Sequence, residues 1–386
     1  MFYVLKILFV CNNAFNKGNG LTTSLQCTMK GLQERGLEVR LMAVENADPS
    51  GPQADYPLKH FVIPIFEPLI RTNGFSFART DRALIREAVR WADVIHLEEA
   101  FPLQVAVYKA ARAEGKPCVS TFHVFPHNIL ANLGFGKRSL LAPLLIGCAN
   151  KFVYNRCTDI QCPSLAVRDY LLASGTRARL HVISNGIEIP AEPQPVKAVN
   201  PGDVIDILCV GRLSREKSPE TLLNAMRFSK YAGRIRLYFA GKGPKEKKYR
   251  KMADRLMKAG VLKQAPVFGF YSSDELATLA AHAYLYIHCA WVEVEGLSCL
   301  EAMREGLVPV IGEGPLIATS AFALCPESRY PERDSRALAQ RIDWWIEHPE
   351  RRNEASREYA AAARRYNLEE SIGQLVQLYQ RALDPQ

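Results

Sequence analysis

Two glutamates lie one loop apart after a predicted strand, in the segment Trp291–Met303. Glu293 falls in the loop, and Glu301 falls in a helix predicted over Leu297–Glu305, which ends at Gly306. The carboxyl edge of an open parallel sheet is where α/β folds bind ligands. Two carboxylates there suit a ligand with several hydroxyls, such as the ribose and hexose of a nucleotide sugar. A solvated acidic loop is the alternative.

Two cations follow another predicted strand, in the segment Val210–Lys217. Gly211 allows a tight turn there, and Arg212 and Lys217 then lie at the carboxyl edge of the sheet. The guanidinium fork and the ammonium charge are suited to bind a diphosphate and to stabilise it as a leaving group. Ordinary surface charge is the alternative, and Arg215 is interpreted in that way.

Glycine turns follow two further predicted strands. In the first, Ala240–Pro244, Gly243 would let a ligand approach the backbone, although a simple turn explains it equally well. In the second, Gly18 and Gly20 precede a predicted helix whose backbone N–H groups could contact a phosphate. That loop is long, and Thr23 replaces the third glycine of a dinucleotide fingerprint, so no NAD site is expected.

His123 stands where the predicted strand Pro117–Phe122 ends. A single histidine is usually structural. Because this one lies at the carboxyl edge of a sheet, a catalytic role and a structural role are equally good interpretations.

Apolar strands alternate with helical patterns along the whole chain, which is typical of βαβ units and parallel sheets. Strands are predicted over Leu5–Cys11, Glu38–Val44, His60–Phe66, Asp93–Leu97, Pro117–Phe122, Asp159–Cys162, Leu180–Ser184, Val204–Val210, Ile235–Ala240, Pro266–Phe268, Ala283–Cys289 and Val308–Ile311. Helices are predicted over Thr22–Arg35, Thr80–Ala92, Leu103–Ala113, Ser139–Arg156, Pro219–Lys230, Lys245–Ala259, Ser273–Ala281 and Leu297–Glu305, and throughout the chain after Ser335. A further short helix is predicted to follow Ser164 as its N-cap.

A proline-rich stretch near residue 190 interrupts this alternation. The 386 residues are too many for one typical domain. We therefore predict an α/β protein with two Rossmann-like, doubly wound domains facing a central cleft. The predicted divisions are 1–189, a linker at 190–202, 203–360, and a C-terminal helix at 361–386 that crosses back to the first domain.

The net charge of +9 predicts anionic partners, such as phosphates, nucleotides or acidic lipid surfaces. Nucleic acid is not expected, because no aromatic residues alternate with the basic ones. The ten cysteines have no metal-site spacing, and no apolar run is long enough to span a bilayer. These features predict a cytoplasmic protein, with peripheral attachment to the inner membrane face as an option.

The combination of Gly211, Arg212 and Lys217 with Glu293 and Glu301 resembles the retaining glycosyltransferases of family 4, which have the GT-B fold. The segments 182–187, 240–244 and 306–310 resemble the corresponding parts of that family. One position departs from the family pattern Glu-Gly-Phe-Gly, because Val294 replaces the first glycine while Gly296 keeps the second. The sugar preference of the family is therefore not carried over.

The resemblance implies roles for the residues at the matching positions. Arg212 and Lys217 would bind the donor diphosphate, Glu293 the hexose and Glu301 the ribose, and His123 would lie beside the reacting sugar. The other implied donor-binding residues are Gly18, Gly20, Gly211, Gly243, Gly296, Leu297 and Ser298. The implied reaction retains anomeric configuration by front-face attack, and the leaving phosphate oxygen takes the acceptor's proton. No cofactor and no metal ion are expected.

The donor is expected to be a UDP-hexose and the acceptor a membrane lipid or a lipid-linked glycan. Apolar and basic residues mixed over Ile129–Tyr154, and the basic run Lys242–Lys258, suit an anionic membrane, although a core helix and a solvated helix face explain them as well. Glu98 and Glu99 are predicted to contact acceptor hydroxyls. The alternatives are a transferase for a soluble sugar, an epimerase of the same fold, and a catalytically silent nucleotide-sugar-binding subunit.

Overall fold

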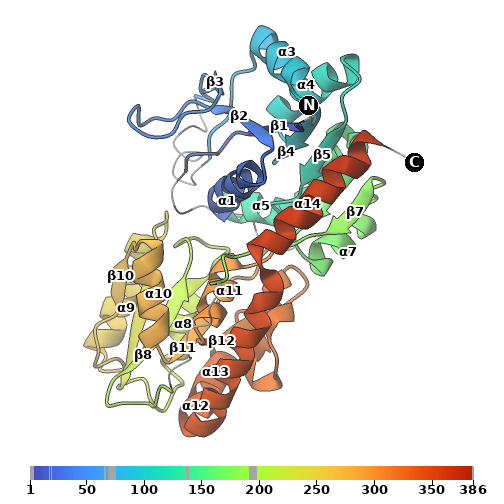
Figure 1. The fold of residues 1–386 in the computed structure, drawn as a ribbon. Coiled ribbons are helices and arrows are strands. Elements are labelled where there is room, and N and C mark those ends of the chain that lie inside the picture. The colour runs from blue at the N-terminus through green and yellow to red at the C-terminus, as the bar shows by residue number, and fades with distance from the viewer. Residues whose placement is uncertain are drawn as a thin grey trace. The chain divides into compact units, whose positions relative to one another are not determined.

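The computed structural model describes residues 4–16, 18, 20–64, 67, 75–135, 139–190 and 198–384. The chain forms two compact units, each with its own sheet and core (Figure 1). The first unit contains Met1–Gly186 and Leu368–Gln386, and the second contains Ile187–Asn367. Most of the predicted linker, residues 191–197, lies outside the described residues.

The first unit is built on a parallel sheet with the order β3-β2-β1-β4-β5-β6-β7. Its central strands are buried on both faces, as expected where helices cover a parallel sheet on either side. The strands are β1 (Lys6–Cys11), β2 (Glu38–Val44), β3 (Tyr56–Leu58), β4 (Val94–Leu97), β5 (Cys118–Thr121), β6 (Asp159–Cys162) and β7 (Arg179–Val182). The helices are α1 (Gly20–Glu34), α3 (Arg82–Trp91), α4 (Pro102–Ala113), α5 (Pro126–Asn132), α6 (Leu141–Phe152) and α7 (Leu165–Ala173).

The last helix, α14 (Leu368–Leu383), packs in this first unit, where Figure 1 shows it beside α1. Its apolar face joins the core that contains β1 and α1. Gly31 of α1 permits the close approach, because a Cβ at that position would lie 2.0 Å from the Ile372 side chain. The Tyr379 hydroxyl lies 2.6 Å from Nδ1 of the buried His96.

The second unit repeats the design with a parallel sheet of order β10-β9-β8-β11-β12-β13. Its strands are β8 (Ile205–Val210), β9 (Ile235–Ala240), β10 (Val267–Gly269), β11 (Leu285–His288), β12 (Val308–Glu313) and β13 (Arg329–Pro331). Its helices are α8 (Pro219–Ala225), α9 (Glu246–Lys258), α10 (Ser273–His282), α11 (Leu297–Arg304), α12 (Ser335–Glu347) and α13 (Pro349–Ala363).

Each sheet reverses its strand order beside its first strand. In the first unit β2 and β4 flank β1, and in the second unit β9 and β11 flank β8. The loops that follow the two strands at such a point lead in opposite directions and leave a crevice between them. The loops after β1 and β4, and those after β8 and β11, are therefore the places to look for ligand-binding residues.

The predicted strand at His60–Phe66 is wrong. The strand in this region is β3, whose pairing with β2 stops at Leu58 because β2 itself ends at Val44. His60 forms only an isolated bridge with Ala78, and Phe61 is half exposed. Residues 65 and 66 lie outside the described residues.

Two elements were absent from the prediction, and two predicted helices are shorter. The edge strand β13 and the helix α5 were not predicted. The helix predicted to Arg156 ends at Phe152, and the helix predicted to Lys230 ends at Ala225. Val153 leaves helical geometry with ψ −68 and φ −130, and a short 3-10 turn follows. In the helical tail, Trp345 is fully buried and Trp344 packs against the core, as expected.

Replacing Tyr379 by Phe tests the attachment of α14. Loss of the hydroxyl leaves the buried His96 nitrogen without its partner, so we expect the free energy of unfolding to fall by about 1–3 kcal/mol. Urea denaturation followed by circular dichroism measures this change. Tyr170→Phe is the control, because in the described part of the chain its hydroxyl has no hydrogen bond. Equal effects of the two variants would contradict the prediction.

Candidate functional site

The clearest charged pair of the second unit joins its two loops at the point of strand reversal. The Lys217 ammonium, in the loop after β8, donates a hydrogen bond to the Glu293 carboxylate, in the loop after β11. His288, at the end of β11, lies 3.4 Å from the same carboxylate. Burial works to raise the pKa of Glu293, but Lys217 and His288 outweigh it and hold that pKa at about 2. Glu293 is therefore ionised at neutral pH.

Further hydrogen bonds join the loop after β8 to the loop after β11. The buried Glu216 carboxylate accepts hydrogen bonds from Arg212 and from the Ser214 hydroxyl, the latter at 2.7 Å. The Trp291 backbone N–H donates to the Glu216 carbonyl at 3.0 Å, and its indole N–H donates to the Arg215 carbonyl at 3.0 Å. Arg212 is thus oriented by Glu216 within a loop that is tied to the loop carrying Glu293.

The glycine turn after β9 packs against the loop after β8. A Cβ at Gly243 would lie 2.5 Å from the Leu213 carbonyl oxygen, and one at Gly241 would lie 2.2 Å from that of Gly211. Backbone packing alone therefore explains Gly243, which the sequence analysis attributed to the approach of a ligand. Its predicted contact with a donor stays a prediction.

Gly296 precedes α11 with a backbone that other residues rarely adopt. Its φ is +98°, and a Cβ would lie 2.4 Å from the Thr319 hydroxyl. This turn brings the start of α11, with Leu297 and Ser298, to the same edge as Glu293. A helix start presents backbone N–H groups and suits an anion. On the next turn, burial raises the pKa of Glu301 although Arg304 opposes the shift.

In the first unit, a buried carboxylate holds the predicted histidine. Glu98, directly after β4, pairs with Nε2 of His123, two residues after the end of β5. Burial works to raise the pKa of Glu98, but His96 and His123 outweigh it and that pKa lies below its ordinary value. An ionised carboxylate only accepts hydrogen bonds, so Nε2 of His123 is the donor in this contact.

Glu99 has a different environment from its neighbour. It accepts hydrogen bonds at 2.6 Å from the Asn12 backbone N–H and from the side-chain amides of Asn12 and Asn13. Burial nevertheless raises its pKa above the ordinary value. Glu99 thereby ties the loop after β4 to the loop after β1, which continues to Gly18 and Gly20. The predicted contacts of Glu98 and Glu99 with acceptor hydroxyls stay predictions.

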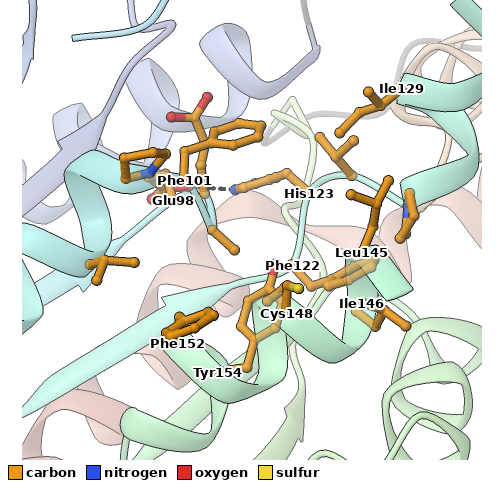
Figure 2. A pocket seen from close by; sticks show the side chains of 17 residues that line it. Glu98, Phe101, Phe122, His123, Ile129, Leu145, Ile146, Cys148, Phe152 and Tyr154 are labelled. Atoms are coloured by element: carbon orange, nitrogen blue, oxygen red, sulfur yellow. Dashed lines mark hydrogen bonds and ion pairs between the residues drawn. The ribbon is translucent and has the colours of Figure 1, made fainter. Parts of the chain in front are cut away.

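An apolar cavity of about 460 Å³ adjoins the Glu98–His123 pair (Figure 2). It lies within the first unit, between the loops after β4 and β5 and the helices α5 and α6. Figure 2 shows the pair on one side, with Leu145, Ile146 and Cys148 of α6 contributing another wall. The sequence analysis singled out the α6 segment but not the cavity.

Neither a metal cluster nor a membrane-spanning helix is found among the described residues. No group of three or more His, Cys, Asp or Glu side chains in that part of the chain is arranged to hold a metal ion. None of its helices combines the length and the apolar character that a membrane crossing requires.

Family models match both units in succession. The model described as Glycosyltransferase Family 4 matches residues 18–189, and that described as Glycosyl transferases group 1 matches residues 191–362. The chain belongs to glycosyltransferase family 4. Its two Rossmann-like units form the GT-B fold of this glycosyltransferase family, as the sequence analysis predicted. Among curated proteins, no sequence matches the chain significantly.

Solved structures include similar glycosyltransferases. Anabaena Alr3699/HepE in complex with UDP and glucose is 17% identical, with a TM-score of 0.69, and the match covers 97% of this chain and 99% of that one. Sucrose-phosphate synthase from Thermosynechococcus elongatus is 18% identical, with a TM-score of 0.72 and 98% of both chains covered. The catalytic domain of cholesterol-alpha-glucosyltransferase from Helicobacter pylori is 40% identical over 42% of this chain and 99% of that one, with a TM-score of 0.40.

Sequence reasoning missed the residues that hold the predicted ones in place. These are Asn12 and Asn13 around Glu99, Glu216 behind Arg212, and His288 beside Glu293. The signal available in the sequence was their position, because each lies at the end of a strand or in the loop after it.

Gly296→Ala tests the turn before α11. Alanine at this φ, against Thr319, should lower the free energy of unfolding by about 1–3 kcal/mol. Thermal or urea denaturation measures the loss. Gly147→Ala, in α6 with nothing within 4 Å of the new Cβ, is the control and should gain up to about 1 kcal/mol. An unchanged Gly296→Ala protein would show that the turn tolerates a side chain.

The pKa of Glu293 predicts how stability depends on pH. Because folding lowers this pKa from 4.5 to about 2, its contribution is complete above pH 4.5 and is lost as the pH falls towards 2. The difference in unfolding free energy between the natural chain and Glu293→Gln should shrink over that range. Glu301→Gln should give the opposite trend, since burial raises the pKa of Glu301. Urea titrations at several pH values measure both, and parallel profiles would refute the assignment.

Proposed function

We propose that this family 4 enzyme transfers a hexose from UDP-hexose to a membrane lipid or lipid-linked glycan with retention of anomeric configuration. The observation that carries the proposal is the Lys217–Glu293 pair at the point of strand reversal, beside the start of α11. A cation suited to a diphosphate there lies next to a carboxylate suited to sugar hydroxyls, which supports the proposal. The Anabaena structures with UDP and with UDP-glucose support the choice of nucleotide.

In the proposed donor site, each residue keeps the role that the family resemblance implies. Arg212 and Lys217 bind the diphosphate together with the backbone N–H groups of Leu297 and Ser298. Glu293 accepts hydrogen bonds from the hexose, and Glu301 from the ribose. Gly211, Gly243 and Gly296 shape the loops. Gly18 and Gly20 close over the phosphates, and His123 lies beside the reacting sugar.

The proposed reaction uses no metal ion and no other cofactor. The acceptor oxygen forms a bond to the anomeric carbon on the face from which UDP departs. The bond from that carbon to the β-phosphate oxygen breaks, and UDP takes its electron pair. The acceptor's proton passes to the departing phosphate oxygen. Arg212 and Lys217 stabilise the charge that develops on the leaving group.

A lipid acceptor is favoured by the apolar cavity next to His123 and by the exposed leucines of α6. Peripheral attachment to an anionic membrane from the cytoplasmic side fits the basic groove between α8 and α9, which Arg227, Lys247, Lys248, Lys251 and Arg255 line. The alternatives are a soluble sugar acceptor and a silent nucleotide-sugar-binding subunit.

A panel of UDP- and GDP-sugars, with and without liposomes, tests the function through released nucleotide. Lys217→Ala and Glu293→Ala should each reduce release at least about 100-fold, because each removes a charge that contacts the donor. Lys258→Ala, at the exposed end of α9, should leave release unchanged. A chelator should not inhibit if the reaction is metal-independent. Binding of a nucleotide sugar without release of nucleotide would favour the silent subunit. Full activity of either site variant would contradict the site assignment.

A further inference from the structure

The cavity beside His123 is polar at one end and apolar elsewhere. Its polar end is formed by Glu98, Glu99 and His123, and the remaining wall consists mainly of aliphatic and aromatic side chains, such as Phe122, Ile129 and Phe152. A volume of about 460 Å³ lies within the range of about 300–1,000 Å³ typical of small-molecule sites. The cavity therefore suits a ligand with a single polar end and an apolar body.

The charge of the cavity wall disfavours a ligand whose polar end carries a phosphate. Neither lysine nor arginine is among the side chains that line it in the described part of the chain. Glu98 is ionised, because its pKa lies below the ordinary value. A phosphate near the reacting hydroxyl would meet this carboxylate with neither a lysine nor an arginine of the lining to offset the repulsion, which is unfavourable in an apolar site.

The surface around the cavity points to a lipid rather than a soluble aromatic compound. Leu145 and Phe152 of α6 belong to the wall and are also 37% and 48% exposed, and Leu144, on the outer face of the same helix, is 61% exposed. Apolar surface thus continues from the cavity onto the outside of the unit. Such surface is typical of a protein that meets a membrane.

Cations gather outside the cavity, where anionic headgroups would lie. A neighbouring hollow shares Val105 and Phe152 with the cavity and is lined by Lys109, Arg112 and Arg156. Positive charge is therefore found beside the cavity and not within it. This pattern suits a neutral lipid that is drawn out of an anionic bilayer.

We propose that the cavity binds a neutral lipid alcohol, whose hydroxyl lies directly on the apolar body and accepts the sugar. The proposal rests on the proposed function and chooses between its two acceptor classes. The apolar body packs against Phe122, Ile129 and α6. The acceptor hydroxyl lies beside His123, and Glu98 is a positioning residue that holds the ring through Nε2.

Transfer assays with matched lipids in mixed micelles test this choice. Dioleoylglycerol and dioleoylphosphatidylglycerol carry the same chains and free hydroxyls, but only the second has a phosphate. With the donor that the panel selects, we expect glycolipid to form from dioleoylglycerol at least about tenfold faster than from dioleoylphosphatidylglycerol. Equal or faster transfer to dioleoylphosphatidylglycerol, or to free glucose, would overturn the proposal.

Variants that fill the cavity give a second test. Ala149→Phe from α6 and Val105→Phe from α4 both place a ring in the cavity, and either one suffices if the other fails to fold. Each should lose glycolipid formation at least about tenfold while keeping acceptor-independent hydrolysis of the donor. Leu172→Phe, on the exposed face of α7 and outside the cavity lining, should transfer normally. Unimpaired transfer by a folded cavity variant contradicts the proposal.

Alkylation of Cys148 measures occupancy without turnover. This thiol lines the cavity and is the exposed one among the ten cysteines. Dioleoylglycerol micelles should slow its reaction with iodoacetamide several-fold, and dioleoylphosphatidylglycerol micelles should not. Equal rates with both lipids would refute the proposed cavity ligand whether or not the enzyme turns over. Protection without nucleotide release from any donor would instead contradict the proposed function and leave the cavity assignment supported.

Discussion

The reversal of strand order beside β1 and β8 is the constraint on which the grouping of candidate residues in each unit depends. A parallel sheet places every strand's carboxyl end at one edge, and the reversal makes neighbouring loops diverge there. Lys217 and Glu293 are 76 positions apart in the chain, yet they meet because they follow the two strands at that point. In the first unit Glu99 meets Asn12 and Asn13 in the same way across β1 and β4, and Glu98 meets His123 across the next pair of strands, β4 and β5. Without this topology the charges would be scattered surface residues.

Burial and the neighbouring groups then set the pKa of each of these carboxyl groups. Glu98 and Glu99 are adjacent in the chain and both almost completely buried, but their pKa values move in opposite directions. Two histidines stabilise the ionised form of Glu98, whereas the amide donors of Asn12 and Asn13 and the weaker effect of His123 do not offset the cost of burying Glu99. One carboxylate therefore orients a histidine, and the other ties two loops together. Identical side chains at neighbouring positions thus serve different purposes.

Much of the architecture was predictable, because strands buried on both faces are continuous apolar runs and helices show a period of 3.6 residues. Strands β2, β6 and β9 have the bounds that the pattern predicts. The region after Val44 was predicted wrongly, since the apolar run there continues beyond the end of its pairing partner. The edge strand β13 was missed because three residues with a proline carry little strand signal.

The sequence by itself determined the family and the candidate residues, because glycine turns and charged loops after strands are local features of the chain. Only the tertiary structure decided which of them interact. It joined Lys217 to Glu293, placed Glu216 behind Arg212, and showed that backbone packing accounts for Gly243. It also formed the cavity beside His123 from three separate segments that no spacing rule connects. Contacts between distant segments depend on packing in three dimensions, and local patterns in a sequence do not record them.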